Sequence, residues 1–366
     1  MSEPTPPAKS SKTRSVPYLD VAIVGLGAIG AAHIDAVKRA SGTRLAAVVD
    51  VDPQIAETTA TRAGCPGFTS IEEMLGGTDV DLVMICTPDH LHLEPVRIAA
   101  AAGKHVFLEK PIATTLEDAE AILDAVDRAG VQFTVGHCLR FDPKYAEVKR
   151  QIDLGAVGDV ASLYARRQNR TSGAKRLKGR VSSLLFLGVH DIDILNWCAG
   201  SDPVAVYCAS TDRVMRSLGY DIDDVSWTTI RYANGTVGVV ESGWLLPDAY
   251  PRNGHFELVA TGSRGVARLD EFDEGLWVAN EAFSHLSWVD RLTPQIDAFA
   301  NAILLDRTPL VSGRDAYAAV EVALAATLSA RHHEEVQLPL RKGTDGPGFR
   351  PTGVEGKVTA RNSSQP

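Results

Sequence analysis

"VAIVGLGAIG", residues 21–30, is the stretch that decides the fold. A short apolar run rich in β-branched residues ends in Gly25-x-Gly27-x-x-Gly30, and a helical pattern covers 28–40. In such a turn the first glycine allows the sharp bend, the second lets backbone N–H groups approach a pyrophosphate, and the third lets helix and strand pack closely. The helix N-terminus adds partial positive charge for the phosphates. The stretch therefore predicts a dinucleotide-binding strand–turn–helix.

A carboxylate lies at the end of the second strand candidate, as a dinucleotide-binding domain requires. The next apolar run, 44–50, ends on Asp50, which follows Gly30 by 20 residues. That is the expected place for a carboxylate that accepts the ribose hydroxyls, and it would repel a 2′-phosphate. We therefore expect NAD as the cofactor and favour it over NADP. The residues expected to bind it here are Gly25, Gly27, Ala28, Ile29, Gly30 and Asp50.

Strand and helix patterns alternate through the first part of the chain. Apolar strand candidates at 81–86, 104–109 and 131–136 alternate with helix candidates, which are 53–63, 91–102 and 115–129. Near-continuous apolar strands that alternate with helices are typical of a parallel sheet covered on both faces. The fold class predicted for this part is α/β, a doubly wound Rossmann domain.

The pattern changes after about residue 140. The later strand candidates are longer: 159–169, 203–212, 223–233, 235–244 and 254–262. Asn234-Gly235 between two of them is a strong hairpin signal. We expect a C-terminal α+β domain with a large, mostly antiparallel open sheet. The expected divisions are a disordered leader (1–17), the NAD-binding domain (18–137), a substrate-binding and oligomerisation domain (138–340) and a disordered tail (341–366).

Composition excludes several classes of function. The chain has 366 residues, 45% hydrophobic and 23% charged, with a net charge of −9, which argues against a nucleic-acid or anionic-membrane binder. Five cysteines without a C-x-x-C pair suit free thiols in a reducing cytoplasm. No apolar run approaches the roughly 18 residues of a membrane span, and the N-terminus lacks a secretory apolar region. We expect a cytoplasmic protein without nucleic-acid or membrane partners.

Candidate site residues follow the strands of the first domain. Thr87-Pro88 in "CTPDHLHLE" (86–94) ends one strand, and "EKP" (109–111) ends the next. The carboxyl ends of parallel strands form the edge where ligands bind. We expect Thr87, His92, Glu109 and Lys110 to lie along the cofactor there, with Lys110 also contacting substrate.

Each of these residues also has an interpretation that involves no role in binding or catalysis. Lys110 could be a solvated strand end, although its position favours catalysis, because positive neighbours and partial burial would lower its pKa. His33, on the first helix, is interpreted as a packing residue. His90 and His92 are too few to form a metal site without a carboxylate at ligand spacing, so no metal is expected.

The second half contributes a possible base. "LLFLGVHDIDILNW" (184–197) puts His190 and Asp193 three residues apart, on one face if the segment is helical. A carboxylate in that position would fix the imidazole tautomer and raise its basicity, as a general base for a hydroxyl requires. The alternative is a His/Asp cluster that caps a helix.

The stretch 165–180 is the one electrostatic anomaly of this acidic chain. It holds seven basic residues and no acidic one: Arg166, Arg167, Arg170, Lys175, Arg176, Lys178 and Arg180. It could lie over the substrate and select phosphate or carboxylate, or it could be a solvated arm that touches another subunit. Both interpretations stay open.

Taken together, the motifs resemble the glucose–fructose oxidoreductase / inositol dehydrogenase (Gfo/Idh/MocA) family. The glycine turn, "TPDHLH", "EKP", "GHCLRFDP" (136–143) and "GVHDID" (188–193) occur in that order, and the resemblance covers nearly all of 18–340. It implies a Rossmann domain and a second domain whose open sheet packs between subunits, hence a homodimer or homotetramer. It also implies hydride transfer on a ring hydroxyl of a sugar or cyclitol, with Lys110 and His190 as catalytic residues.

This family resemblance leaves one mismatch and two alternatives. Many members have an aspartate four residues before the histidine, where this chain has Phe186, so Asp193 is the remaining candidate to orient His190. Arg140 and Arg167 complete the expected substrate-binding set. We therefore predict an NAD-dependent dehydrogenase for a sugar or cyclitol, with an anionic substrate as one option. The alternatives are an enzyme that oxidises transiently to cleave a glycosidic bond, and a nucleotide-binding sensor without turnover.

Overall fold

The computed structural model describes residues 18–252, 254–270, 275–279, 285–286 and 290–340. The leader predicted for 1–17 and the tail predicted for 341–366 lie outside these residues. Within the described part, no helix is both long and apolar enough to cross a bilayer.

The first sheet has six parallel strands in the order β3-β2-β1-β4-β5-β6, which is the order of dinucleotide-binding domains. Its strands are β1 (Leu19–Val24), β2 (Thr43–Val49), β3 (Gly67–Phe68), β4 (Leu82–Ile85), β5 (His105–Leu108) and β6 (Phe133–Val135). Its helices are α1 (Ala28–Arg39), α2 (Pro53–Ala63), α3 (Ile71–Gly77), α4 (Leu93–Ala101) and α5 (Leu116–Ala129). The predicted Rossmann domain is confirmed.

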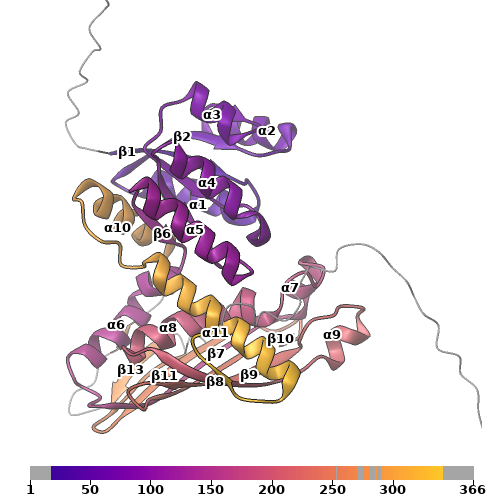
Figure 1. Cartoon of the computed structure of the whole chain (residues 1–366), viewed down its shortest axis with the longest axis vertical. Helices are drawn as coiled ribbons and strands as arrows, with labels where there is room; N and C mark the ends of the chain where they lie inside the picture. Colours follow the sequence, from indigo (N-terminus) through magenta and orange to yellow (C-terminus); the bar gives the residue numbers. More distant parts are fainter. Residues whose placement is uncertain (1–17, 253, 271–274, 280–284, 287–289, 341–366) are drawn as a thin grey trace, which may run out of the picture.

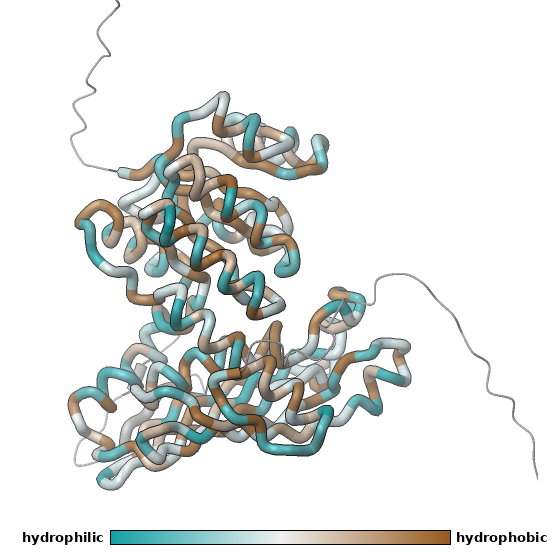
Figure 2. Tube along the Cα trace, in the orientation of Figure 1, coloured by the Kyte–Doolittle hydropathy of each residue, from teal (hydrophilic) through white to brown (hydrophobic). Residues whose placement is uncertain are grey.

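The strands of this domain are mostly apolar because helices cover both faces of the sheet. Every residue of β1 and β4 is buried. The helices show the complementary pattern: α5 buries Leu116, Ile122 and Val126 and exposes polar residues, and in Figure 2 teal and brown segments alternate along the helices of this half. Asp52 and Thr115 are the N-caps of α2 and α5. These two helices follow β2 and β5 in the chain, so their N-termini lie toward the carboxyl ends of the strands. Strand ends and helix N-termini therefore share the edge that holds the candidate site.

The second sheet has nine strands among the described residues, in the order β14-β13-β12-β11-β7-β10-β9-β8-β15. They are β7 (Val160–Arg170), β8 (Pro203–Thr211), β9 (Val225–Tyr232), β10 (Val237–Leu246), β11 (Gly254–Gly262), β12 (Val266–Asp270), β13 (Gly275–Ala279), β14 (His285–Leu286) and β15 (Val336–Gln337). All neighbours are antiparallel except β7 and β10, which run parallel. The predicted open, mostly antiparallel sheet is confirmed, and Asn234-Gly235 joins β9 to β10 with Gly235 at φ +88°.

Helices cover one face of this second sheet. They are α6 (Pro143–Asp153), α8 (Val189–Ala199) and α11 (Gly313–His332), and Figure 1 shows them between the sheet and the Rossmann domain. α10 (Leu292–Leu304) packs against α1 of the Rossmann domain. The other face exposes Tyr207 and Trp227, 44% and 45% accessible. Association of subunits through this face stays a prediction.

The short elements were not predicted. They include α7 (Thr171–Arg176), α9 (Arg213–Ser217), β12 to β15 and a π-helical turn, Leu184–Gly188, that runs directly into α8. Segments of two to seven residues carry too few positions to display a period. The π-helical turn matters because it lies next to the candidate site.

Candidate functional site

The glycine turn has the geometry that a dinucleotide needs. Gly25 has φ +89°, and a Cβ there would lie 2.7 Å from the carbonyl oxygen of Cys86; a Cβ on Gly30 would lie 2.0 Å from the carbonyl oxygen of Gly25. A Cβ on Gly27 would meet no atom within 4 Å, so the backbone faces open space at that point. Gly27, Ala28 and Ile29 are exposed. The amino end of α1 therefore presents its N–H groups to an approaching phosphate.

Asp50 is held beside this turn. One carboxylate oxygen accepts the Leu26 N–H at 2.8 Å, and the other accepts the Asp52 N–H at 3.0 Å. Thr87, at the carboxyl end of β4, has a buried hydroxyl with no hydrogen-bond partner among the described residues. An open glycine turn, an oriented carboxylate and an unsatisfied hydroxyl on one edge fit a dinucleotide with its ribose toward Asp50.

His92 is buried between the loops after β4 and β5. The side chain is 2% exposed, with Nδ1 3.0 Å from the Pro111 carbonyl oxygen and Nε2 3.1 Å from the Thr87 carbonyl oxygen. The contact of His92 with the nucleotide stays a prediction, and the contacts that the structure shows are structural. His92 connects the loop after β4 to the loop after β5, and so sets the spacing of the two parts of the edge.

Glu109 also faces the protein interior. Its carboxylate lies 2.6 Å from Nε2 of His33, which is fully buried, and accepts the Lys110 backbone N–H at 3.1 Å. Burial would raise the pKa of Glu109, but the hydrogen bond from His33 and the nearby charge of Lys110 bring it below the ordinary value. The cofactor contact of Glu109 stays a prediction, and His33 is a buried packing residue that also fixes Glu109.

Lys110 reaches from the Rossmann domain to the second domain. Its ammonium donates a hydrogen bond to the carbonyl oxygen of Phe186 at 2.9 Å and lies 4.3 Å from the centre of the Phe186 ring. The ring in turn packs against Trp244, which is fully buried. Burial lowers the pKa of Lys110, and Glu109 opposes this shift. The π-helical turn Leu184–Gly188 thus supplies the group that positions the lysine.

His190 lies four residues after Phe186, in the first turn of α8. Its side chain is half-buried, and Nδ1 is buried with no hydrogen-bond partner among the described residues. Burial lowers the pKa of His190 well below the ordinary value, and positive groups, Lys110 first among them, lower it further. The imidazole is therefore neutral at neutral pH and able to accept a proton.

Among the described residues, no hydrogen bond or ion pair joins Asp193 to His190. Arg140 donates to both carboxylate oxygens of Asp193, at 2.9 and 2.7 Å, and both side chains are almost fully buried. The i, i+3 spacing does put Asp193 on α8 near His190, but a guanidinium from the loop after β6 occupies the carboxylate. Arg140 also donates to the Leu310 carbonyl oxygen at 3.3 Å and pairs with Asp315 at 3.3 Å, and its role as a substrate ligand stays a prediction.

Arg167 is engaged in the same way. It donates to both carboxylate oxygens of Asp191, at 2.6 and 3.0 Å, and stacks over Phe256. The side chains of Arg167 and Asp191 are buried. Its expected role as a substrate ligand stays a prediction, and the structure shows it primarily as one half of a buried ion pair.

The basic stretch 165–180 is not a single loop. Its first part belongs to β7, where Arg166 pairs with Glu241 at 2.8 Å and Arg170 donates to two backbone carbonyl oxygens. Arg180 crosses to the Rossmann domain and pairs with Asp89 in the loop after β4. Part of the stretch therefore joins the two domains through an ion pair, which neither sequence-based interpretation included.

Two further groups near His190 were missed by the sequence analysis. His137, directly after β6, is 1% exposed; neither ring nitrogen has a hydrogen-bond partner among the described residues, although Nδ1 lies 3.8 Å from a carboxylate oxygen of Asp193. Arg291, just before α10, lies 3.9 Å from Asp142. His137 was detectable because it follows a parallel strand as Lys110 does. Arg291 carries no local motif.

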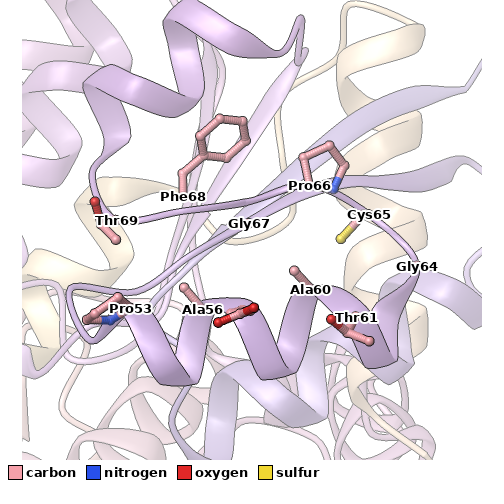
Figure 3. Close-up of a pocket in the computed structure, with 11 residues that line it drawn as sticks. Pro53, Ala56, Ala60, Thr61, Gly64, Cys65, Pro66, Gly67, Phe68 and Thr69 are labelled. Carbon is pink, nitrogen blue, oxygen red and sulfur yellow. The ribbon is translucent and has the colours of Figure 1, made fainter.

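Two other features lie apart from the pair Lys110 and His190. His255, Glu257 and Asp270 are close enough to share a cation, but Arg268 donates to both carboxylates, at 2.9 and 3.0 Å. A hollow of about 510 Å³ lies between α2 and β3, with Cys65 and Phe68 in its wall (Figure 3). Neither contains a predicted site residue.

Comparisons with known proteins agree with this geometry. Residues 19–137 match the model of an oxidoreductase family with an NAD-binding Rossmann fold, and residues 145–268 match the Gfo/Idh/MocA C-terminal domain. The chain is 28% identical over 340 residues to scyllo-inositol 2-dehydrogenase (NAD+) of Bacillus subtilis, covering 89% of this chain and 98% of that protein. It is 28% identical over 260 residues to 2,7-anhydro-N-acetylneuraminate hydratase of Mediterraneibacter gnavus, covering 69% and 68%.

A solved structure gives the same fold. The scyllo-inositol dehydrogenase of Lactobacillus casei, with NAD(H) and scyllo-inositol bound, superimposes with a TM-score of 0.77 at 24% identity. The match covers 87% of this chain and 99% of that one.

Proposed function

We propose that this chain, which belongs to the Gfo/Idh/MocA family of NAD-binding oxidoreductases, is a dehydrogenase that oxidises a secondary ring hydroxyl of a sugar, sugar derivative or cyclitol. The observation that carries the proposal is the convergence of Lys110 and His190. They come from different domains, and the hydrogen bond from Lys110 to Phe186 brings the lysine within about one helical turn of His190. A relative that covers 89% of this chain is an inositol dehydrogenase by name, which supports the substrate class.

Each residue of the site has its own role in the proposed reaction. Bound NAD supplies the hydride acceptor. His190, neutral because burial and positive neighbours lower its pKa, accepts the proton of the substrate hydroxyl. The Lys110 ammonium donates a hydrogen bond to the same oxygen and stabilises negative charge as it develops there. Glu109 and His33 fix the backbone from which Lys110 projects.

The test is NADH formation with a panel of sugars, cyclitols and their acidic derivatives. Turnover of at least one of them at a catalytic rate supports the proposal. Tight NAD binding without NADH formation from any of them would contradict it and favour the sensor interpretation.

The hydratase relative supports a second candidate, in which the same site oxidises only transiently. Product would then accumulate with no net NADH, which a parallel assay of product and NADH would detect.

Asp50 should set the cofactor preference. We expect Asp50→Ala to narrow the preference for NAD over NADP, because it removes both the acceptor for the ribose hydroxyls and the charge that repels a 2′-phosphate. The ratio of kcat/KM for the two cofactors measures this. Asp52→Asn, which changes a neighbouring helix cap, is the control and should leave the ratio as it is. An unchanged ratio in Asp50→Ala would remove the residue from the cofactor site.

The pH profile should report the environment of His190. A base must be neutral to accept a proton, so we expect the acid limb of kcat/KM to lie below pH of about 6.5, the ordinary histidine value. Arg291→Gln removes one of the positive groups that lower this pKa, and should therefore move the limb to higher pH. The exposed His332→Gln should not move it. An acid limb at or above the ordinary value in the parent enzyme would contradict the role of His190.

A further inference from the structure

Glu109 is a buried carboxylate that is enclosed on three sides. Its side-chain oxygen Oε1 lies 2.6 Å from Nε2 of His33, and Oε2 accepts the backbone N–H of Lys110 at 3.1 Å. On the third side a Cβ at Gly136 would lie 3.0 Å from Oε1, so the glycine backbone closes the space there. Glu109 is thus held in one place, directly beside Lys110.

His33 reaches this carboxylate from α1. Its ring is fully buried and packs edge-on against Phe107, with the ring centres 5.3 Å apart. The other ring nitrogen, Nδ1, is buried and has no hydrogen-bond partner among the described residues. An ionised carboxylate only accepts hydrogen bonds, so Nε2 carries the hydrogen. An apolar ring would pack against Phe107 as well, so the histidine is distinguished here by its hydrogen bond to Glu109.

The charges of Glu109 and Lys110 depend on each other. Burial would raise the pKa of Glu109, and the hydrogen bond from His33 does most to lower it below the ordinary value instead. Burial lowers the pKa of Lys110, and the charge of Glu109 does most to oppose this shift. Other titratable groups lie near one or both of the two: Cys86, Asp89, His92, His137, Cys138, Arg167 and His190. His33 is therefore coupled to the Lys110 ammonium without touching it.

We propose that His33 is a positioning residue of the reaction: through Glu109 it keeps Lys110 in the charged form that donates to the substrate oxygen. The inference rests on the proposed function and adds to it a residue that is fully buried in the Rossmann domain. The contacts run from His33 to Glu109 and from Glu109 to Lys110. Loss of His33 should therefore change the pH at which Lys110 loses its proton.

The test is the basic limb of the pH profile of kcat/KM, along which activity falls as Lys110 loses its proton. A lysine that loses a nearby negative charge has a lower pKa, so the limb should move to lower pH. We expect His33→Phe, which keeps a ring against Phe107, to move it by about one pH unit, the lower end of the effect of one opposite charge. Glu109→Gln should move it at least as far, and His33→Phe should add nothing in that background.

Two further variants serve as controls. His33→Gln places an N–H donor near the position of Nε2 and should return the limb toward that of the parent. His105→Gln changes a half-buried histidine at the amino end of the same strand, β5, and should leave the limb in place. Chemical denaturation of each variant separates a loss of fold from a loss of function.

The inference is overturned by an unmoved limb in His33→Phe, by a shift to higher pH, or by a further shift when His33→Phe is added to Glu109→Gln. If His33→Phe does not fold, His33→Asn, whose shorter side chain does not reach Glu109, takes its place with the same expected shift.

A second readout separates this inference from the function on which it rests. The Cε resonance of Lys110, assigned with Lys110→Arg in isotope-labelled protein with NAD bound, reports the titration of the lysine without any substrate. It should move to lower pH in His33→Phe. If no NADH forms with any substrate, the proposed function fails, and this titration decides the inference: the same shift supports it, and an unchanged titration contradicts it.

Discussion

Lys110→Ala is expected to lower kcat by about two to four orders of magnitude, the usual range for loss of an acid–base or oxyanion-stabilising group. The ammonium lies at the junction of the two domains, where it donates a hydrogen bond to the Phe186 carbonyl oxygen four residues before His190. NAD affinity should stay nearly unchanged, because the glycine turn and Asp50 lie at other strand ends. Steady-state kinetics and a direct NAD titration measure the two quantities separately.

Lys104→Ala is the matched control. Lys104 precedes the amino end of the same strand, β5, and pairs at 3.4 Å with the exposed Asp79. A pair of that kind is worth about 0–1 kcal/mol, so this variant should keep both kcat and stability. Near-parental turnover of Lys110→Ala would mean that Lys110 is a solvated strand end and that the active site lies elsewhere.

The second large effect concerns stability. Asp193→Ala should lower the free energy of unfolding by about 1.5–3 kcal/mol, the value of a hydrogen bond to a charged group, because it removes the bidentate partner of the buried Arg140 guanidinium and leaves only Asp315, at 3.3 Å. Chemical denaturation measures this. Asp153→Ala, at the exposed end of α6, removes a surface ion pair with Lys149 and should change stability by about 0–1 kcal/mol.

The same variant decides between two roles for Asp193. A stable Asp193→Ala protein with a sharply reduced kcat would restore the role suggested by the spacing in "HDID", in which Asp193 orients His190. A destabilised protein whose folded fraction keeps its pH profile would support the ion pair with Arg140.

The parts of the site that sequence could predict are those set by local geometry. Gly25 and Gly30 are fixed by close backbone approach, and Lys110 by its place after a parallel strand, so a short motif with its strand context was sufficient. The family resemblance added the pairing of Lys110 with the segment around His190. The same edge rule would have found His137, which ends the next strand.

The contacts that sequence could not predict are made between residues that lie far apart in the chain. The helix spacing placed Asp193 near His190, but Arg140, 53 residues away, takes its carboxylate. His92 looked like a nucleotide contact because of its position, and only the fold shows that two backbone carbonyl oxygens occupy its ring nitrogens. The parallel pairing of β7 with β10 is likewise a matter of long-range register, which periodicity does not encode.

The central claim is that Lys110 and His190 act together on one substrate oxygen. The most direct measurement is a double-mutant cycle on the rate of NADH formation, with Lys110→Ala, His190→Ala and the double variant. Groups that act as a unit are strongly non-additive, so the double variant should be little slower than the slower single variant. A double variant whose loss equals the product of the two single losses would contradict the account.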